Sequence, residues 1–139
     1  MTFNGYIESV RLKAFSWGDH DCITFANKAC AMQQGKGFAD EFLGKYSTAK
    51  GALLTYQRWL KTTDYNNLIE GVDDRLQRLK TTIPPIGSIV SEKENDVGSG
   101  VLPMRFGVCL GRWIAFVGDD GFVWSPPTSQ MIFWGVRNG

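Results

Sequence analysis

The stretch FSWGDHDCITFANKA, residues 15–29, sets a Trp-Gly pair ahead of Asp21 and Cys22 and then continues in a helical pattern. Asp is a favoured helix N-cap, and two glycines follow the apolar run, so we predict a helix from Cys22 to Gln33. Cys22 would then occupy the first turn, where the positive end of the helix dipole favours a thiolate. The residues predicted to face the core with it are Phe25, Ala26, Ala29 and Cys30.

The remainder of the first half also has helical patterns. Apolar residues at three- and four-residue spacing predict an amphipathic helix over residues 3–15. Ser47 is the expected cap of a further helix through residues 49–61, and residues 67–79 continue with a helical composition. The inner face expected for the helix over residues 49–61 consists of Leu53, Leu54, Tyr56, Gln57 and Leu60.

From Ile83 onwards the pattern changes to short β-branched and aromatic runs separated by turn residues. Such runs with tight turns are typical of an antiparallel meander, and helices followed by strands predict an α+β fold. We therefore expect one domain over residues 1–139, helical over 1–82 and a β meander over 83–139. We expect one strand that ends at Val90 and four more that cover residues 104–111, 112–118, 121–127 and 130–136. A surface loop is expected at residues 94–103.

The composition disfavours several classes of function. With 15 Lys and Arg against 14 Asp and Glu, the net charge is +1 and no basic block is present, which disfavours nucleic acid as the partner. We expect no signal peptide, and no stretch reaches the roughly 20 apolar residues that cross a bilayer. The three cysteines form no CxxC pair, which argues against a disulfide framework or a zinc ribbon, so we expect no metal and no cofactor.

Four segments resemble motifs of the NlpC-type branch of the papain-like cysteine peptidases. Trp17-Gly18 with Asp21-Cys22 is similar to the motif that opens the helix of the nucleophile, and residues 87–90 resemble its Gly-Asp-Leu/Val strand. Residues 105–111 fall on the strand that begins with the catalytic histidine, and residues 122–126 on the strand of the third catalytic residue. The resemblance implies a papain-like fold in which N-terminal helices pack on a C-terminal antiparallel sheet.

Over residues 15–136 the chain more closely resembles a subgroup encoded among bacteriophage and prophage tail genes. The shared features are the GKYSTAKGA segment at 44–52, the GVCLG strand at 107–111 and the aromatic IFWGV end at 132–136. The resemblance implies a place in the virion, at the phage tail, after synthesis in the bacterial host cytoplasm. It also implies other tail-tip or hub proteins as partners, with peptidoglycan as a further candidate ligand.

The chain departs from the peptidase pattern at both positions that complete the catalysis. Arg105 stands where the catalytic histidine is expected, and Trp124 stands where the third catalytic residue is expected. The one histidine of the chain is His20, two residues before Cys22. A guanidinium group stays protonated and shuttles no proton, whereas amide cleavage needs an acid for the leaving amine. Trp17, Arg105 and Trp124 would then line a degenerate cleft that binds rather than cleaves.

Each candidate residue also has a simpler structural interpretation. Cys22 is better explained as a small buried hydrophobe than as a nucleophile, and His20 as a solvent-facing or capping loop residue than as a base. Asp19 and Asp21 fit turn and capping roles, and Cys109 fits strand packing. The tryptophans that could serve either as core or as interface anchors are Trp17, Trp113, Trp124 and Trp134.

Two hypotheses of different classes follow. The first is a structural or assembly protein of the phage tail tip, in which the peptidase fold is kept as a protein-binding module. The second is a peptidoglycan-peptide amide hydrolase with Cys22 as nucleophile, which needs His20 or a partner subunit as the base. Binding of peptide or glycan in the old cleft without cleavage is an intermediate alternative.

Overall fold

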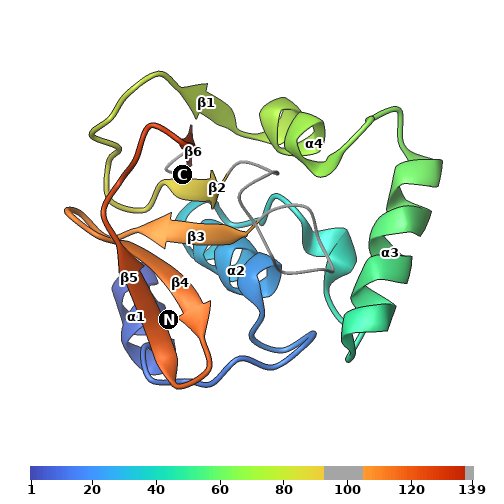
Figure 1. Cartoon of the computed structure of the whole chain (residues 1–139), viewed down its shortest axis with the longest axis horizontal. Coiled ribbons are helices and arrows are strands. Elements are labelled where there is room, and N and C mark those ends of the chain that lie inside the picture. Colours follow the sequence, from blue (N-terminus) through green and yellow to red (C-terminus); the bar gives the residue numbers. More distant parts are fainter. Residues whose placement is uncertain (93–104, 137–139) are drawn as a thin grey trace.

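The computed structural model describes residues 1–92 and 105–136. In this part of the chain, four helices pack against a six-stranded antiparallel sheet, which confirms the α+β prediction (Figure 1). The helices are α1 (Phe3–Val10), α2 (Cys22–Gln34), α3 (Ala49–Thr62) and α4 (Leu68–Arg75), with a 3-10 turn η1 (Asp40–Phe42). The strands are β1 (Gln77–Leu79), β2 (Ile89–Glu92), β3 (Phe106–Cys109), β4 (Ile114–Gly118), β5 (Gly121–Ser125) and β6 (Met131–Gly135). The loop predicted at 94–103 lies outside the described residues.

Helix α2 forms as the sequence predicts and lies at the centre of the molecule (Figure 1). The Asp21 side chain caps it by accepting a hydrogen bond of 2.9 Å from the backbone N–H of Thr24. Gly35 ends it in a left-handed conformation with φ of 88°, which glycine adopts without strain. The inward-facing residues Phe25, Ala26, Ala29 and Cys30 are fully buried.

The strand order is β1-β6-β2-β3-β4-β5, so the predicted meander is only partly correct. Strands β2 to β5 follow one another in space, but β6 returns to the other side of β2, where Ile89 pairs with Trp134. The outer edge of β5 is already partly used, because the backbone N–H of Phe122 donates to the carbonyl of Arg11 at 2.9 Å. The last strand therefore completes the sheet beside β2.

Two of the predicted helices are shorter in the structure. The helix expected over residues 3–15 ends at Val10, since the chain beyond it runs beside the β4–β5 hairpin and donates from Phe15 to the carbonyl of Gly118. The helix expected over residues 67–79 ends at Arg75, and the following strand β1 pairs with β6. The predicted boundary at residue 82 between a helical half and a β half is therefore wrong.

The cap and the inner face of α3 also differ from the prediction. Thr48, not Ser47, is the cap, and its hydroxyl accepts a hydrogen bond of 3.0 Å from the backbone N–H of Gly51. Leu54 and Gln57, which were predicted for the inner face, instead face solvent. The residues of α3 that are buried are Ala52, Tyr56 and Trp59.

Apolar side chains cover both faces of the sheet. The larger cluster lies between sheet and helices and includes Phe25, Phe106 and Trp134. A smaller cluster on the other face includes Cys109 and Phe116, together with Val90, Ile114, Met131 and Phe133. Cys109 therefore packs, as predicted. Within residues 1–92 and 105–136, none of the helices has the length and apolar character that crossing a bilayer requires.

Candidate functional site around Cys22

Cys22 is the first residue of α2 and is partly buried. Burial raises the pKa of its thiol to about 11. Hydrogen bonds from the backbone N–H groups of Phe106 and Ile23 lower this pKa, and the positive charge of Arg105 lowers it least. The effect of burial is larger, so the pKa stays raised. The thiol is therefore protonated near neutral pH, although it lies at a helix N-terminus.

The Asp21 carboxylate links the segment before α2 to the helix and to Tyr46 through hydrogen bonds. Besides capping Thr24, its carboxylate accepts from the backbone N–H of Gly18 at 2.8 Å and from the hydroxyl of Tyr46 at 2.8 Å. Gly18 has φ of 82°, and a Cβ there would lie 2.0 Å from the carbonyl oxygen of Tyr46. The capping role predicted for Asp21 is confirmed, and the glycine of the Trp-Gly pair is required by this close approach.

His20 does not face solvent, so the simpler interpretation given for it from the sequence is wrong. Its backbone N–H donates to the carbonyl of Ser16 at 2.8 Å, and this tight turn directs the ring inward. The side chain is 1% exposed and lies edge-on to Phe25 with 5.8 Å between ring centroids. Its Nε2 atom has no hydrogen-bond partner among the described residues, and burial, followed by the charge of Lys13, lowers its pKa. The imidazole is therefore neutral at pH 7.

Arg105 directly precedes β3, and its side chain contacts Glu92 and Phe116. Its guanidinium donates to the Glu92 carboxylate at 2.6 Å and lies 4.0 Å from the centroid of the Phe116 ring. Phe116 belongs to the cluster on the face of the sheet opposite α2, so the arginine side chain lies on that face. Arg105 therefore acts on Cys22 only through its charge.

Trp124 lies on the terminal strand β5, where it is paired with Ala115 of β4. Trp113 is two residues before Ala115, so the strand alternation brings both indoles to the same face of the sheet. They are 52% and 48% exposed and together line a cavity of about 340 Å³. The sequence singled out Trp124 for this site but not the Trp113 beside it, and the two-residue alternation was the signal that could have found it.

The three residues predicted to line the cleft therefore each contact different neighbours. Trp17 is partly buried beside Phe15, with 4.8 Å between the ring centroids, and Trp124 is exposed beside Trp113. Arg105 lies on the other face of the sheet. Within the described residues, no three His, Cys, Asp or Glu side chains gather closely enough to hold a metal ion.

A protein-family model matches residues 1–136, almost the whole chain. The chain belongs to the DUF6950 family. The family is described as a domain of unknown function, and it includes both the α2 region and the complete sheet. No curated protein and no solved structure matches this DUF6950 chain.

Proposed function

We propose that this DUF6950 protein is a structural or assembly component of a bacteriophage tail tip, and that its fold is a papain-like, NlpC-type peptidase fold acting as a protein-binding module. The motif resemblance supports the origin of the fold, and the resemblance to tail-gene products supports the place in the virion. Its partners would be other tail-tip or hub proteins. The particle would acquire the protein after its synthesis in the host cytoplasm.

The observation on which the proposal depends is the missing base at Cys22. Papain-like cleavage needs a thiolate and an acid that protonates the leaving amine. Burial keeps the Cys22 thiol protonated, the neutral His20 ring packs on Phe25, and Arg105 is bound to Glu92. These surroundings favour a packing role for Cys22 over a catalytic one.

The exposed aromatic corner of the sheet supports a binding role. Trp113 and Trp124 are each about half exposed, and Ile86 is 66% exposed close to Gly111, two residues before Trp113. Large aromatic side chains are enriched at the centres of protein interfaces, where each can contribute several kcal/mol. This corner is the surface that we expect to contact the neighbouring tail protein.

The proposal is tested on particles of the phage that encodes the chain. Mass spectrometry of purified virions should find the protein, and deleting its gene should block tail assembly or infectivity. The Trp113→Ala/Trp124→Ala variant should be incorporated much less than a Met32→Ala control, since Met32 is also a partly exposed apolar residue but lies on α2. Virions free of the protein, assembled normally without its gene, would refute the proposal.

The second candidate is the Cys22-dependent peptidoglycan amide hydrolase. The observation that favours it is the position of Cys22 at the first turn of a capped helix, with N–H groups of Phe106 and Ile23 directed at the sulfur. The test is the pH dependence of Cys22 alkylation, followed by mass spectrometry of the Cys22 peptide. Alkylation that rises only above about pH 10 supports the binding module. A thiolate already present at pH 7, together with cell-wall digestion that Cys22→Ala abolishes, would establish the hydrolase instead.

A further inference from the structure

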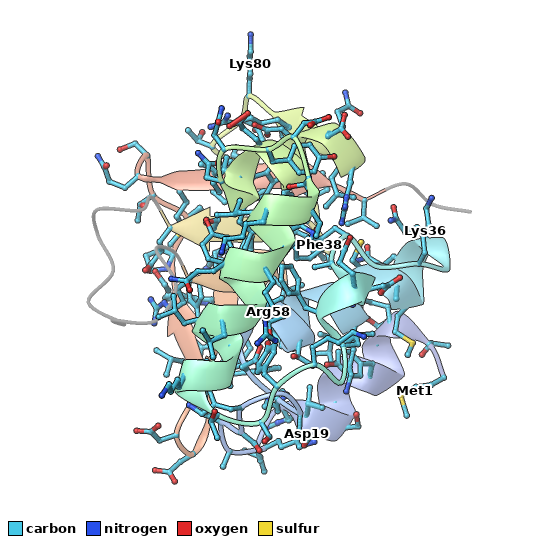
Figure 2. All side chains as sticks on the ribbon, turned by 90° about the vertical axis from the view of Figure 1, so that its right-hand side faces the viewer. Met1, Asp19, Lys36, Phe38, Arg58 and Lys80 are labelled. Carbon is cyan, nitrogen blue, oxygen red and sulfur yellow. The ribbon has the colours of Figure 1, made fainter. Side chains whose placement is uncertain are left out.

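A hollow of about 260 Å³ lies between α3 and the segment around η1, far from Cys22 in the sequence. Figure 2 looks at α3 face-on, with Arg58 near the middle of the helix. The residues that line the hollow are Glu41, Phe42 and Lys45 from the η1 segment, and Thr55, Arg58, Trp59 and Thr62 from α3. The helix stands at the outer edge of the molecule (Figure 1), and Lys45 and Arg58, which line the hollow, are exposed to solvent.

The floor of the hollow is apolar and closely packed. Phe42 and Trp59 are 4% and 7% exposed, and their ring centroids are 5.4 Å apart. The far edge of the Trp59 ring packs so closely on Gly71 that a Cβ there would lie 2.6 Å from it. A large aliphatic or aromatic side chain of a ligand would therefore meet a preformed surface at the base of the hollow.

The rim of the hollow has a positive charge that the protein itself does not neutralise. Glu41 is bound to Arg75 at 2.6 Å, so these two charges cancel. Burial alone would raise the pKa of Glu41, but the hydrogen bond and the charge of Arg75 outweigh it and lower the pKa, so the carboxylate stays ionised. Lys45 and Arg58 form no ion pair within the described residues, and they leave two uncompensated positive charges beside the apolar floor.

The outer ridge of α3, formed by Lys50, Leu54, Arg58 and Lys61, also combines basic residues with an apolar one. Lys50, Leu54 and Arg58 follow at four-residue spacing, and Lys61 is three residues further, so they lie along one side of the helix. Leu54 is 39% exposed on this ridge. The helix contains three basic residues and no acidic one, in a chain whose net charge is only +1. This local imbalance is complementary to a partner with carboxylates spaced around an apolar residue.

We propose that the hollow and the α3 ridge bind an acidic segment of a partner protein, with an apolar side chain of that segment against Phe42 and Trp59 and its carboxylates at Lys45 and Arg58. The apolar floor favours a peptide over nucleic acid, whose binding depends on extended rows of phosphate contacts. The inference does not depend on the tail-tip proposal, because it concerns a different surface from the Trp113–Trp124 corner and holds for any acidic partner.

The proposal is tested by NMR with the full-length protein and defined probes. The probes are the acetylated and amidated peptide Glu-Asp-Leu-Phe-Glu-Asp and the small molecule phenylpropionate. Matched controls are the peptide Gln-Asn-Leu-Phe-Gln-Asn and phenylpropylamine. We expect the acidic probes to shift the amide signals of Thr55, Arg58 and Thr62 and the indole N–H signal of Trp59, and the shifts to decrease as salt is added.

Variants locate the binding surface. Arg58→Glu and Lys45→Glu should each weaken binding of the acidic peptide by roughly tenfold, because an attractive charge becomes a repulsive one. Lys80→Glu is the matched control, since Lys80 is an exposed lysine at the far upper end of the molecule in Figure 2, and it should leave the affinity nearly unchanged. Thermal unfolding of each variant checks that the fold is kept.

Three results would overturn the proposal. One is the lack of shifts at these signals with both acidic probes at millimolar concentration. Another is equal binding of the neutral peptide or of the amine, which would show that charge does not contribute. The third is Arg58-dependent binding of anionic phospholipid vesicles or of single-stranded DNA without binding of the acidic peptide, which would assign the surface to a different partner.

Discussion

Asp21 makes the hydrogen bonds that hold residues 17–24 in their observed conformation. It caps α2 and holds both the Gly18 turn and Tyr46, and it is 1% exposed. Cys22, next to it, has a raised pKa, and His20, just before it, packs on Phe25. At the scale of single residues, the structure therefore explains the motif by packing and hydrogen bonding.

Replacing Asp21 tests this structural role. We expect Asp21→Ala to lower the free energy of unfolding by about 2–3 kcal/mol, because it removes a helix cap and leaves the Tyr46 hydroxyl and the Gly18 N–H without their partner. Urea unfolding followed by tryptophan fluorescence measures the change. Asp19→Ala, which removes only the exposed ion pair with Lys13, should have a much smaller effect. Similar effects of both substitutions would contradict the central role of Asp21.

His20 gives a pH dependence of stability with a defined sign. Its pKa is lower in the folded protein than the ordinary value of 6.5, because burial disfavours the charged ring. Below pH 6.5 the unfolded chain therefore binds more protons, and stability falls as the pH decreases toward the folded pKa. Unfolding curves between pH 7.5 and 5, compared with those of His20→Gln, should show this loss only in the wild type. An equal loss in the variant would assign it to other groups.

At the scale of elements, local signals set the ends of some helices and tertiary contacts set others. The ends of α2 follow from Asp21 and Gly35, which act within the helix itself. The end of α1 at Val10 depends on hydrogen bonds to the β4–β5 hairpin, from a part of the chain over a hundred residues away. Pattern reasoning sees the first kind of signal and not the second.

The sequence predicts Ser47 as the cap of α3, whereas the structure has Thr48, and substitutions at these two positions distinguish the alternatives. We expect Thr48→Ala to cost about 1 kcal/mol of stability, because the Thr48 hydroxyl accepts from the N–H of Gly51. Ser47→Ala should change stability by less than about 0.3 kcal/mol, since Ser47 makes no such cap. Chemical unfolding of both variants provides the measurement. The reverse order of effects would restore Ser47 as the cap.

At the scale of the whole molecule, strand pairing and a side-chain hydrogen bond connect the helices with the sheet. Strand β1 follows α4 and joins the far edge of the sheet, and the indole N–H of Trp134 in β6 donates to Asp73 of α4 at 2.8 Å. Strand β6 therefore attaches the helical layer to the sheet.

Trp134 tests this attachment. We expect Trp134→Phe to lower the free energy of unfolding by about 1–2 kcal/mol, through the lost bond to Asp73 and the space left in a fully buried site. Trp124→Phe is the matched control, because the same substitution at a half-exposed position should change stability little. Differential scanning calorimetry compares the two. Equal effects would show that β6 does not anchor the helical layer.

The predictions from the sequence were correct where the deciding interactions are close in the chain. The α+β class, the start and inner face of α2, the tight turn between the strands predicted at 112–118 and 121–127, and the packing of Cys109 were all accessible in this way. The shorter helices, the place of β6 and the burial of His20 were not. Each depends on a partner that the chain brings near only after folding.

By itself, the sequence determined the α+β class and the caps of α2, because propensity, capping and alternation act over a few residues. It also shows a single histidine, His20, two residues before Cys22. Only the tertiary structure decided that Arg105 is bound on the opposite face of the sheet, and that Lys45 and Arg58 line one hollow above an apolar floor. The physical reason is that burial and pairing of charges depend on residues that are distant in sequence and adjacent only in the folded chain.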